Sequence, residues 1–484
     1  MQFLRKATYW VLLAAMLTAG GFLLFTQLGE AIISECDEAR HGVNAYEMMQ
    51  SGDYLVSTYR GETDYWNLKP PLSLYSIILG YQLFGFNAFG MRFYSALSML
   101  LTMLVLALWM KRRYGSAASL GTLGFMLACS MIYGPHFARF GDADAQMVLF
   151  YTISMLCMLE SRKNLRWLYG SAVCFGLAFM SKSWHAALIP VTCLLYVCVT
   201  GLIKKLNWKQ YLLLLFWGLL PIAPWAVARY LHDGMAFFAP MFTKDVVARA
   251  TTVHETHYGD VAHYVRVLMR EPVVALTAVF IAAALLWKLV RRSRIHADHW
   301  GVALWMLTPL FFFSICVSKL DWYIFPCLPA LAVGLGMVLG RLLHSLKGSA
   351  CIPRIACAVI AFGLMGYWTS VNWNYVSAEP NQNRYQLIMT EYFDREYDSG
   401  ERIYIQYESQ NKYSTSNDYR VWVQDDVLTA QLCGDLVCLD GGIDAFLEEE
   451  EHAYLICHDV GMDWTLLEEY PILSEEGPVM LLEN

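Results

Sequence analysis

Eleven stretches of this sequence are apolar over roughly the length that a membrane-spanning helix needs. They are residues 7–28, 89–110, 116–135, 143–160, 166–181, 183–202, 210–230, 272–290, 299–317, 322–340 and 355–375. A spanning helix requires roughly 20 mostly apolar residues. The chain is 57% hydrophobic and only 16% charged, which is too apolar for one soluble core of 484 residues. We therefore expect an α-helical polytopic membrane protein with about eleven transmembrane helices.

Basic residues predict how the chain is oriented in the membrane. Short loops that carry Lys and Arg stay on the cytoplasmic side. Such clusters occupy alternate loops, among them Arg5-Lys6, Lys111-Arg112-Arg113 and Lys204-Lys205. This alternation predicts a multi-pass protein of the cytoplasmic (inner) membrane, with a cytoplasmic N-terminus and an outward C-terminal region.

The end of the chain differs sharply from the rest. Residues 379–484 hold 24 acidic and five basic residues, a net charge of −19, whereas the remainder carries +12. Short apolar runs at 402–407, 436–439 and 453–457 predict strands, and 384–397 and 444–451 predict helices. We expect residues 376–484 to form a small, acidic, soluble α/β domain outside the membrane, in which Cys433 and Cys438 could pair in an oxidising compartment.

Two outward segments, residues 29–88 and 231–271, are too long to be simple turns in the transmembrane domain expected over residues 1–375. Long segments of this kind are usually functional. In the first, residues 37–50 have helical spacing that ends at Ser51-Gly52. Lys69-Pro70-Pro71 then opens an apolar run at 72–85 that is too short to span.

Several charged residues recur at the outer ends of the expected spans. Asp37-Glu38-Ala39-Arg40 begins the helix of the first segment, and taken alone this motif is more typical of a helix cap with a surface ion pair. Charge at a membrane boundary is costly and points to function. The group comprises Asp37, Glu38, Arg40, Lys69, Arg139, Asp144, Lys182, Lys319 and Tyr323. We expect these residues to meet in one outward pocket, with structural pairing across helices as the alternative.

The order of these motifs resembles a known family. Asp-Glu-Ala-Arg, Lys69-Pro70-Pro71, Arg139 with Asp144, Lys182 and the Ser318-Lys319-x-x-Trp322-Tyr323 motif follow the order of the GT-C glycosyltransferases. The likeness is to the bacterial branch of the protein O-mannosyltransferase group that contains the lipid A aminoarabinose transferases, and it covers about residues 5–375. Leu68 stands where that family usually has an acid.

The resemblance implies an inverting transfer of a sugar from a polyprenyl phosphate to a lipid A-like glycolipid or glycan at the outer face of the membrane. It implies catalytic roles for Asp37, Glu38 and Asp144, with Asp37 as general base or as the group that orients the acceptor. The other roles concern binding. Arg40, Lys69, Arg139, Lys182 and Lys319 would bind the donor phosphate, Tyr323 and His257 would bind substrate, and Asp37 with Asp144 could hold a divalent cation.

Other functions fit the sequence less well. A protein O-glycosyltransferase would use the same donor chemistry and differ only in its acceptor. A lipid or sugar transporter would usually show internal repeats with breaks near mid-membrane, and no such repeat is evident. No glycine-rich phosphate loop, nucleotide-binding fingerprint or zinc spacing occurs, and nothing indicates nucleic acid as a partner. The expected partners are a polyprenyl-phosphate sugar, its acceptor and membrane lipids.

Overall fold

The computed structural model describes residues 2–252, 259–293, 295–345, 351–408, 418–459 and 464–484. The chain divides into two compact units, each assembled from separate stretches of sequence. The first contains Met1–Thr26, Leu68–Ser73 and Ser95–Ala378, and the second contains Gln27–Asn67, Leu74–Tyr94 and Glu379–Asn484.

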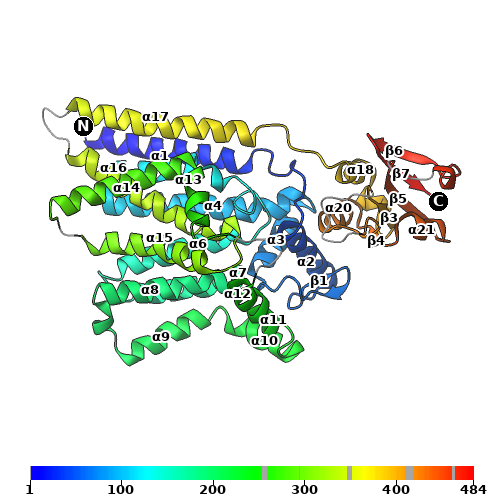
Figure 1. Cartoon of the computed structure of the whole chain (residues 1–484), viewed down its shortest axis with the longest axis horizontal. Coiled ribbons are helices and arrows are strands. Elements are labelled where there is room, and N and C mark those ends of the chain that lie inside the picture. The colour runs from blue at the N-terminus through cyan, green and yellow to red at the C-terminus, as the bar shows by residue number, and fades with distance from the viewer. Residues whose placement is uncertain (1, 253–258, 294, 346–350, 409–417, 460–463) are drawn as a thin grey trace. The chain divides into compact units, whose positions relative to one another are not determined.

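The first unit is helical, and its long helices run side by side in Figure 1. Its main helices are α1 (Gln2–Phe25), α4 (Ala88–Tyr114), α5 (Ser116–Ala128), α6 (Asp144–Glu160), α7 (Trp167–Lys182), α8 (Leu188–Val199), α9 (Trp208–Leu219), α10 (Ala223–Asp233), α13 (His263–Arg270), α14 (Pro272–Val290), α15 (Ala297–Ile315), α16 (Cys327–Ser345) and α17 (Cys351–Val376). Helix α4 begins in the second unit and continues into the first.

Short helical segments connect these helices. They are α11 (Phe238–Phe242), α12 (Arg249–Thr251), the π-helix η4 (Thr243–Ala248), and the 3₁₀ helices η1 (Ser130–Ile132), η2 (Ser183–Ala187), η3 (Leu202–Lys205) and η5 (Asp321–Ile324). The long segment predicted at 231–271 thus contains short helical pieces in the part that the structure describes.

The number of spans differs from the prediction. Within the described residues, six helical stretches are long and apolar enough to cross a membrane: Ala7–Phe25, Ala88–Tyr114, Trp167–Val199, Pro272–Val290, Asp321–His344 and Ile355–Val376. A seventh results if α9 and α10, which meet at a bend of 60°, count as one span. Each of the eleven predicted ranges does contain helix. The structure nevertheless supports six or seven spans by this measure. Helices α5 and α6 have only 13 and 17 residues, α15 is not apolar enough, and η2 joins α7 and α8 into one stretch.

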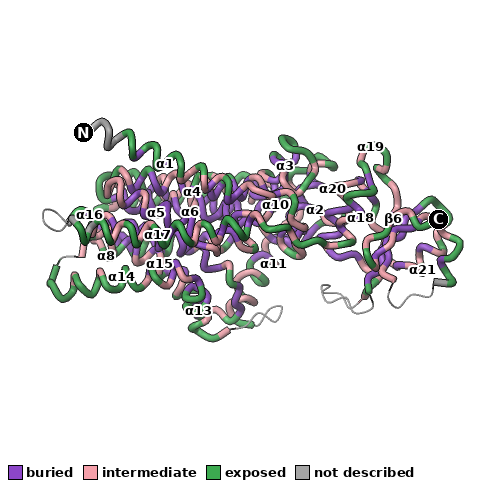
Figure 2. The backbone as a smooth tube through the Cα atoms, turned by 90° about the horizontal axis from the view of Figure 1, so that it is seen from above, coloured by how far each residue is buried: buried purple, intermediate pink, exposed green. Residues whose placement is uncertain are grey.

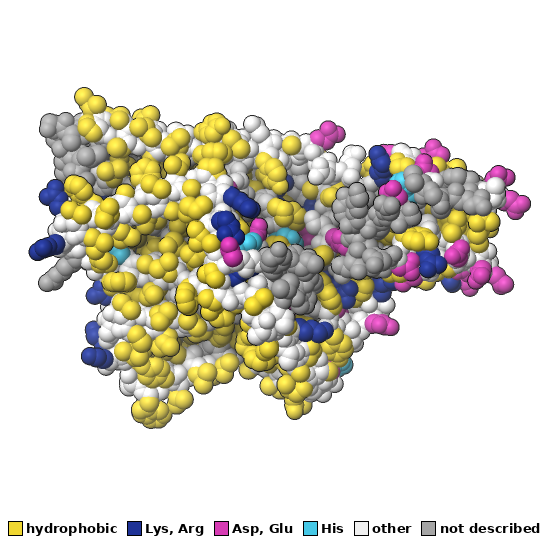
Figure 3. Space-filling model, viewed as in Figure 1, with side chains coloured by type: hydrophobic (Ala, Val, Ile, Leu, Met, Phe, Trp, Pro, Cys, Tyr) yellow, Lys and Arg dark blue, Asp and Glu magenta, His cyan; other side chains and the backbone are white. Residues whose placement is uncertain are grey.

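Burial sorts the helices of this unit into inner and outer ones. The span that contains α16 has 89% of its apolar window buried, whereas the spans of α14 and α17 have 17% and 11%. Figure 2 shows the same contrast along the backbone, and hydrophobic side chains cover the outer face of these helices in Figure 3. An apolar surface of this kind is suited to lipid, so the chain is a multi-pass membrane protein.

The second unit is built around a five-stranded sheet with the order β4-β3-β5-β7-β6. Its strands are β3 (Arg402–Gln406), β4 (Val437–Leu439), β5 (Ala453–His458), β6 (Ile472–Glu476) and β7 (Val479–Glu483). Strand β3 pairs in parallel with β4 and β5, while β7 pairs antiparallel with β5 and β6. Helices α18 (Arg384–Tyr392), α19 (Arg395–Asp398), α20 (Gln424–Gly434) and α21 (Gly442–Leu447), with the 3₁₀ helix η7 (Trp464–Leu466), complete the C-terminal part.

The predicted strands of this region are confirmed as β3, β4 and β5. Helix α20 and the hairpin of β6 and β7 were missed. The hairpin carries Glu475 and Glu476, which weaken the apolar pattern of a strand. The predicted helix at 384–397 is split into α18 and α19, because Asp394 begins a new helix by accepting a hydrogen bond from the backbone of Glu396.

Most of the first long segment, apart from residues 68–73, belongs to this second unit. Helix α2 (Asp37–Ser51) is followed by a small hairpin of β1 (Thr58–Tyr59) and β2 (Glu62–Thr63), and then by α3 (Leu72–Phe84). One apolar core contains residues of α2 and α3 together with residues of α18, α20, β3, β5 and β7. The segment is therefore packed into the C-terminal domain rather than standing alone as a loop.

Gly42 allows α2 to approach α20 closely. A Cβ atom at this position would lie 2.3 Å from Cδ2 of Leu428 and 2.8 Å from Sδ of Met91, both of them buried. Distances this short require the neighbouring side chains to move, and they have little room in a packed core. A glycine here is thus required by packing rather than by backbone conformation.

We predict that Gly42→Val destabilises the second unit by about 1–3 kcal/mol, the usual cost of overpacking a core. The purified protein should lose its folded signal at a lower temperature and become more sensitive to protease in the second unit. Gly363→Ala is the matched control, because a Cβ there meets nothing within 4 Å. An unchanged melting temperature for Gly42→Val would contradict this account of the α2–α20 contact.

Candidate active site

Asp37 begins helix α2, as the sequence predicted. The helix runs to Ser51 and ends at Gly52, which has the left-handed backbone conformation with φ of 71°. Cys36, just before Asp37, also has a positive φ of 69°, which is uncommon for a residue with a side chain. Asp37 is half-buried at the end of the helix where the backbone dipole favours a negative charge.

Glu38 faces the interior and pairs with Arg92. Its Oε1 and Oε2 atoms accept hydrogen bonds of 2.7 and 2.9 Å from the Nε and Nη2 atoms of Arg92, and both side chains are only 1% exposed. The remaining donors of Arg92 reach the backbone carbonyls of Leu28, Ala31 and Ile32. All five N–H groups of this guanidinium are therefore used.

Arg40 is held by a carboxylate of the same unit. Its Nε and Nη2 atoms donate to Asp64 at 2.7 and 2.9 Å, and its guanidinium lies 3.5 Å from the centre of the Tyr59 ring. Asn44 also donates to Asp64 at 2.9 Å. Burial alone would raise the pKa of Asp64, but the hydrogen bonds and charge of Arg40 hold that pKa below its usual value. The bidentate pair braces the turn after β2 against α2.

Asp144 and Lys182 form a buried ion pair in the first unit. Asp144 starts α6 and Lys182 ends α7, and the Nζ atom of Lys182 donates to Oδ2 of Asp144. Each side chain is 3% exposed. A buried charge needs a partner of opposite sign. The structure therefore brings together two of the predicted site residues.

Tyr323 lies beside this pair and anchors a further cation. Its ring centre is 6.0 Å from the Nζ atom of Lys182, and its hydroxyl accepts a 2.9 Å hydrogen bond from Nη1 of Arg249. The ring of His185 packs edge-on against Tyr323, with 4.5 Å between ring centres. The charges of Lys69, Lys182 and Arg249 all act on His185. Lys182 and Arg249 thus lie beside one aromatic corner, and Arg249 also lies 3.6 Å from Asp245. With Lys69 near enough for its charge to act there, this arrangement suits a phosphate.

Two other predicted cations cap helices. Arg139 donates to the carbonyls of Leu23, Leu24 and Thr26 at the end of α1, at 2.8–3.1 Å. Lys319 donates to the carbonyls of Phe313, Ser314 and Cys316 at the end of α15. Cations favour helix C-termini because unpaired carbonyls and the dipole concentrate negative charge there.

His136 and Asp142 form a second polar pair of the first unit. Nδ1 of His136 is 2.8 Å from Oδ2 of Asp142, and the imidazole stacks on Trp322 with ring centres 3.8 Å apart. An imidazole and a carboxylate are both ordinary ligands for a divalent cation. Asp144 is less suited to that role, because the ammonium group of Lys182 already occupies one of its oxygens.

Sequence reasoning missed three contributors to this arrangement and named one that cannot be described. Arg92 was hidden inside an apolar stretch, although a charge in a span is itself a signal. His185 and Arg249 do not belong to the motifs from which the site was predicted. His257, the predicted substrate-binding histidine, lies outside the described residues.

Comparison with known sequences finds similarity to glycosyltransferases. A family described as dolichyl-phosphate-mannose-protein mannosyltransferase matches residues 68–227. The undecaprenyl phosphate-alpha-4-amino-4-deoxy-L-arabinose arabinosyl transferase 2 of Pseudomonas fluorescens (strain Pf0-1) is 30% identical over 334 residues, which are 65% of this chain and 57% of that protein. The predicted family resemblance is confirmed. A transferase of the same description from Pseudomonas aeruginosa (strain UCBPP-PA14) is 26% identical over 75% of this chain and 66% of that protein.

Solved structures share the overall fold of this chain. The crystal structure of ArnT from Cupriavidus metallidurans bound to undecaprenyl phosphate is 18% identical, with a TM-score of 0.73, and the match covers 99% of this chain and 98% of that one. The archaeal oligosaccharyltransferase AglB from Archaeoglobus fulgidus matches with a TM-score of 0.55 at 11% identity, over 94% of this chain and 70% of that one. The chain spans little more than half the length of the first curated relatives that it matches.

We predict that Arg92→Met strongly destabilises the protein, by roughly 3–5 kcal/mol, because it leaves the carboxylate of Glu38 buried without its cation. The double variant Glu38→Gln/Arg92→Met removes both charges and should recover part of this loss. Thermal unfolding of the purified protein in detergent measures the two effects. A double variant no more stable than Arg92→Met would show that the ion pair is not what Arg92 supplies.

Proposed function

We propose that this protein is an inverting glycosyltransferase that moves a sugar from a polyprenyl phosphate to an envelope acceptor, a lipid A-like glycolipid or a glycan. The observation that carries the proposal is the cation cluster of Lys69, Lys182 and Arg249 around His185 and Tyr323. A polyprenyl phosphate ends in the kind of anion that such a cluster would bind. The names of the relatives, which specify undecaprenyl phosphate-linked aminoarabinose, support the same donor class.

The leaving group of this reaction is the lipid phosphate. When the bond between the anomeric carbon and the phosphate oxygen breaks, the electron pair stays on that oxygen, and negative charge builds up there. Lys69, Lys182 and Arg249 would stabilise this charge in a setting that water reaches poorly. Asp144, which the sequence predicted to be catalytic, would take part by holding Lys182 in position.

The nucleophile would be a hydroxyl group of the acceptor. A hydroxyl attacks poorly unless a base removes its proton. We assign this role to Asp37, which is half-buried at the start of α2. Its neighbours Glu38 and Arg40 would act by fixing that helix, through Arg92 and Asp64. The products are a new glycosidic bond with inverted configuration, a polyprenyl phosphate, and a proton on Asp37.

We place the reaction at the outer face of the cytoplasmic membrane, because the basic clusters of the alternate loops favour a cytoplasmic N-terminus. A divalent cation held by Asp37, or by His136 with Asp142, remains part of the proposal. A protein acceptor is the second candidate, and the description of the matching family favours it. Supplying the purified protein with either a lipid A acceptor or an unfolded peptide would decide between the two acceptors.

We predict that Asp37→Asn lowers turnover by roughly 10²–10⁴-fold, the usual contribution of a general base. The measurement is release of free polyprenyl phosphate from a polyprenyl-phosphate sugar by the purified protein. Glu62→Gln, an exposed acid in the same long segment, should keep normal turnover. Near-normal turnover by a well-folded Asp37→Asn variant would refute the assignment.

The donor site makes a separate prediction. Lys69→Met and Arg249→Met should each lower kcat/KM for the donor by about a hundredfold, since each removes a positive charge beside the departing phosphate. Lys204→Met is the control, because Lys204 is an exposed lysine of the short helix η3. If both variants match that control, the phosphate is not bound at this cluster.

A further inference from the structure

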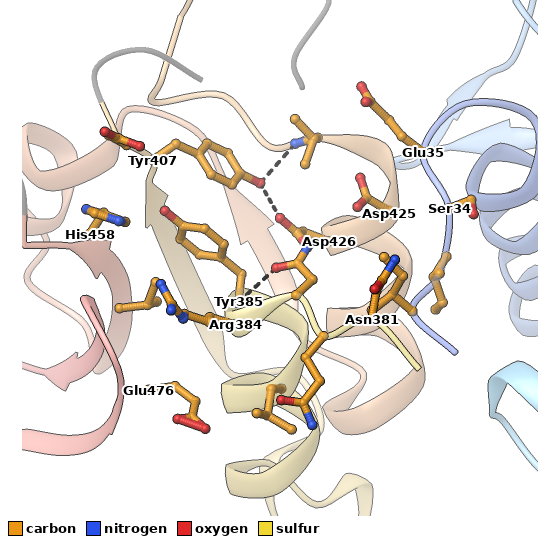
Figure 4. Close-up of a pocket in the computed structure, with 18 residues that line it drawn as sticks. Ser34, Glu35, Asn381, Arg384, Tyr385, Tyr407, Asp425, Asp426, His458 and Glu476 are labelled. Carbon is orange, nitrogen blue, oxygen red and sulfur yellow. Dashed lines mark hydrogen bonds between the residues drawn. The ribbon is translucent and has the colours of Figure 1, made fainter. Parts of the chain in front are cut away.

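The second unit contains a large cavity of about 1030 Å³, lined by both polar and apolar side chains, that the transfer reaction proposed above does not use. Its polar lining comes mainly from the stretch before α2 with Glu35, the stretch from Asn381 to Tyr385, and the start of α20 with Asp425 and Asp426. Residues near the ends of β3, β5 and β6 complete the lining. All of them belong to the same compact unit. Figure 4 shows Glu35 and Asp425 on one side of the cavity, with Arg384 and His458 on the other.

The two aspartates at the start of α20 are not equally satisfied. Asp426 accepts a 2.7 Å hydrogen bond from the hydroxyl of Tyr407. The Oδ2 atom of Asp425 accepts from Gln386 at 3.0 Å, but its Oδ1 atom is buried and has no hydrogen-bond partner among the described residues. Asp425 as a whole is only 8% exposed. A helix N-terminus favours acids, and backbone N–H groups at the start of α20 act on this carboxylate. A buried oxygen without a full hydrogen bond can still take a donor from a ligand.

No cation of the described chain compensates these acids. Within those residues, no ion pair joins Glu35, Asp425 or Asp426 to a basic side chain. Arg384 lies on the other side of the cavity from Glu35 and Asp425 (Figure 4). Its guanidinium is beside Gly477 in the turn between β6 and β7, about 3 Å from the position that a Cβ of Gly477 would occupy. Burial, and then the neighbouring charge of Glu38, raise the pKa of Asp425 to about 6. Unpaired buried carboxylates of this kind are costly and are usually retained for a ligand.

We propose that this cavity binds a small organic cation, whose protonated primary amine is held by Glu35 and Asp425. An ammonium group supplies three donors for carboxylate oxygens that lack them. The cavity is far larger than an ion, and its amides, from Asn381 to Asn383, suit the polar groups of an organic carrier.

A bare metal ion fits this site less well. Among the described residues, the oxygens of Glu35, Asp425 and Asp426 do not converge within 4.8 Å of one another, as a set of metal ligands would. Calcium or magnesium would require such convergence. One ammonium group can instead donate a hydrogen bond to each carboxylate, while the rest of the ligand fills the cavity. This binding does not depend on the transferase reaction proposed above.

Isothermal titration of the full-length purified protein tests the proposal with four probes. Glucosamine carries a primary ammonium group on a sugar, and spermidine carries such groups on an aliphatic chain. The probe that binds therefore shows which kind of molecule the cavity accepts. N-acetylglucosamine, which keeps the sugar but lacks the charge, should not bind. Magnesium chloride is the fourth probe, and it should produce no saturable signal at this site.

Asp425→Asn should weaken binding of the amine about tenfold or more, because a charged acceptor is replaced by a neutral one. Glu35→Gln, on a different segment, should have the same effect, so the proposal survives if one variant fails to fold. Glu450→Gln, an exposed acid outside the cavity, is the control and should bind normally. Failure of both amines to bind, equal binding of N-acetylglucosamine, or magnesium binding that Asp425→Asn abolishes would each overturn the proposal.

Discussion

The buried guanidinium of Arg92 is the constraint on which the candidate active site depends. Its five donors bind the carboxylate of Glu38 and three carbonyls of the chain that follows α1. Because neither charge reaches water, both must keep their partners. This requirement fixes the start of α4 relative to the start of α2. The position of Asp37, one residue before Glu38, follows from it.

The same rule assigns different tasks to cations that look alike in the sequence. Arg139 and Lys319 satisfy carbonyls at helix ends, and Arg40 satisfies Asp64. Each of these cations is bound by carbonyl or carboxylate oxygens of the fold itself. Lys182 and Arg249 also have acidic partners, Asp144 and Asp245. Together with Lys69 they lie near an aromatic corner where we propose that the donor phosphate binds. This division separates residues that build the fold from those that we propose to bind the donor.

The acidic C-terminal region shows how far a pattern can mislead about organisation. Its negative charge suggested a separate domain, and strands β3, β4 and β5 were predicted from short apolar runs (Figure 3). Yet its core is completed by α2 and α3, which lie more than 300 residues earlier in the sequence. Each of these helices buries an apolar face that only the tertiary structure supplies with a partner.

The sequence by itself determined the membrane class, most of the helical ranges, the start of α2 at Asp37 and the family resemblance, because hydropathy, helix signals and motif order are local properties of the chain. Tertiary structure decided which helices are long enough to span. That depends on where each helix ends and on whether two consecutive helices, such as α7 and α8, continue as one stretch. Tertiary structure also decided which charges pair. Asp144 and Lys182 are 38 residues apart, and Glu38 and Arg92 are 54 apart. Such pairs are selected by burial and geometry, which no local pattern records.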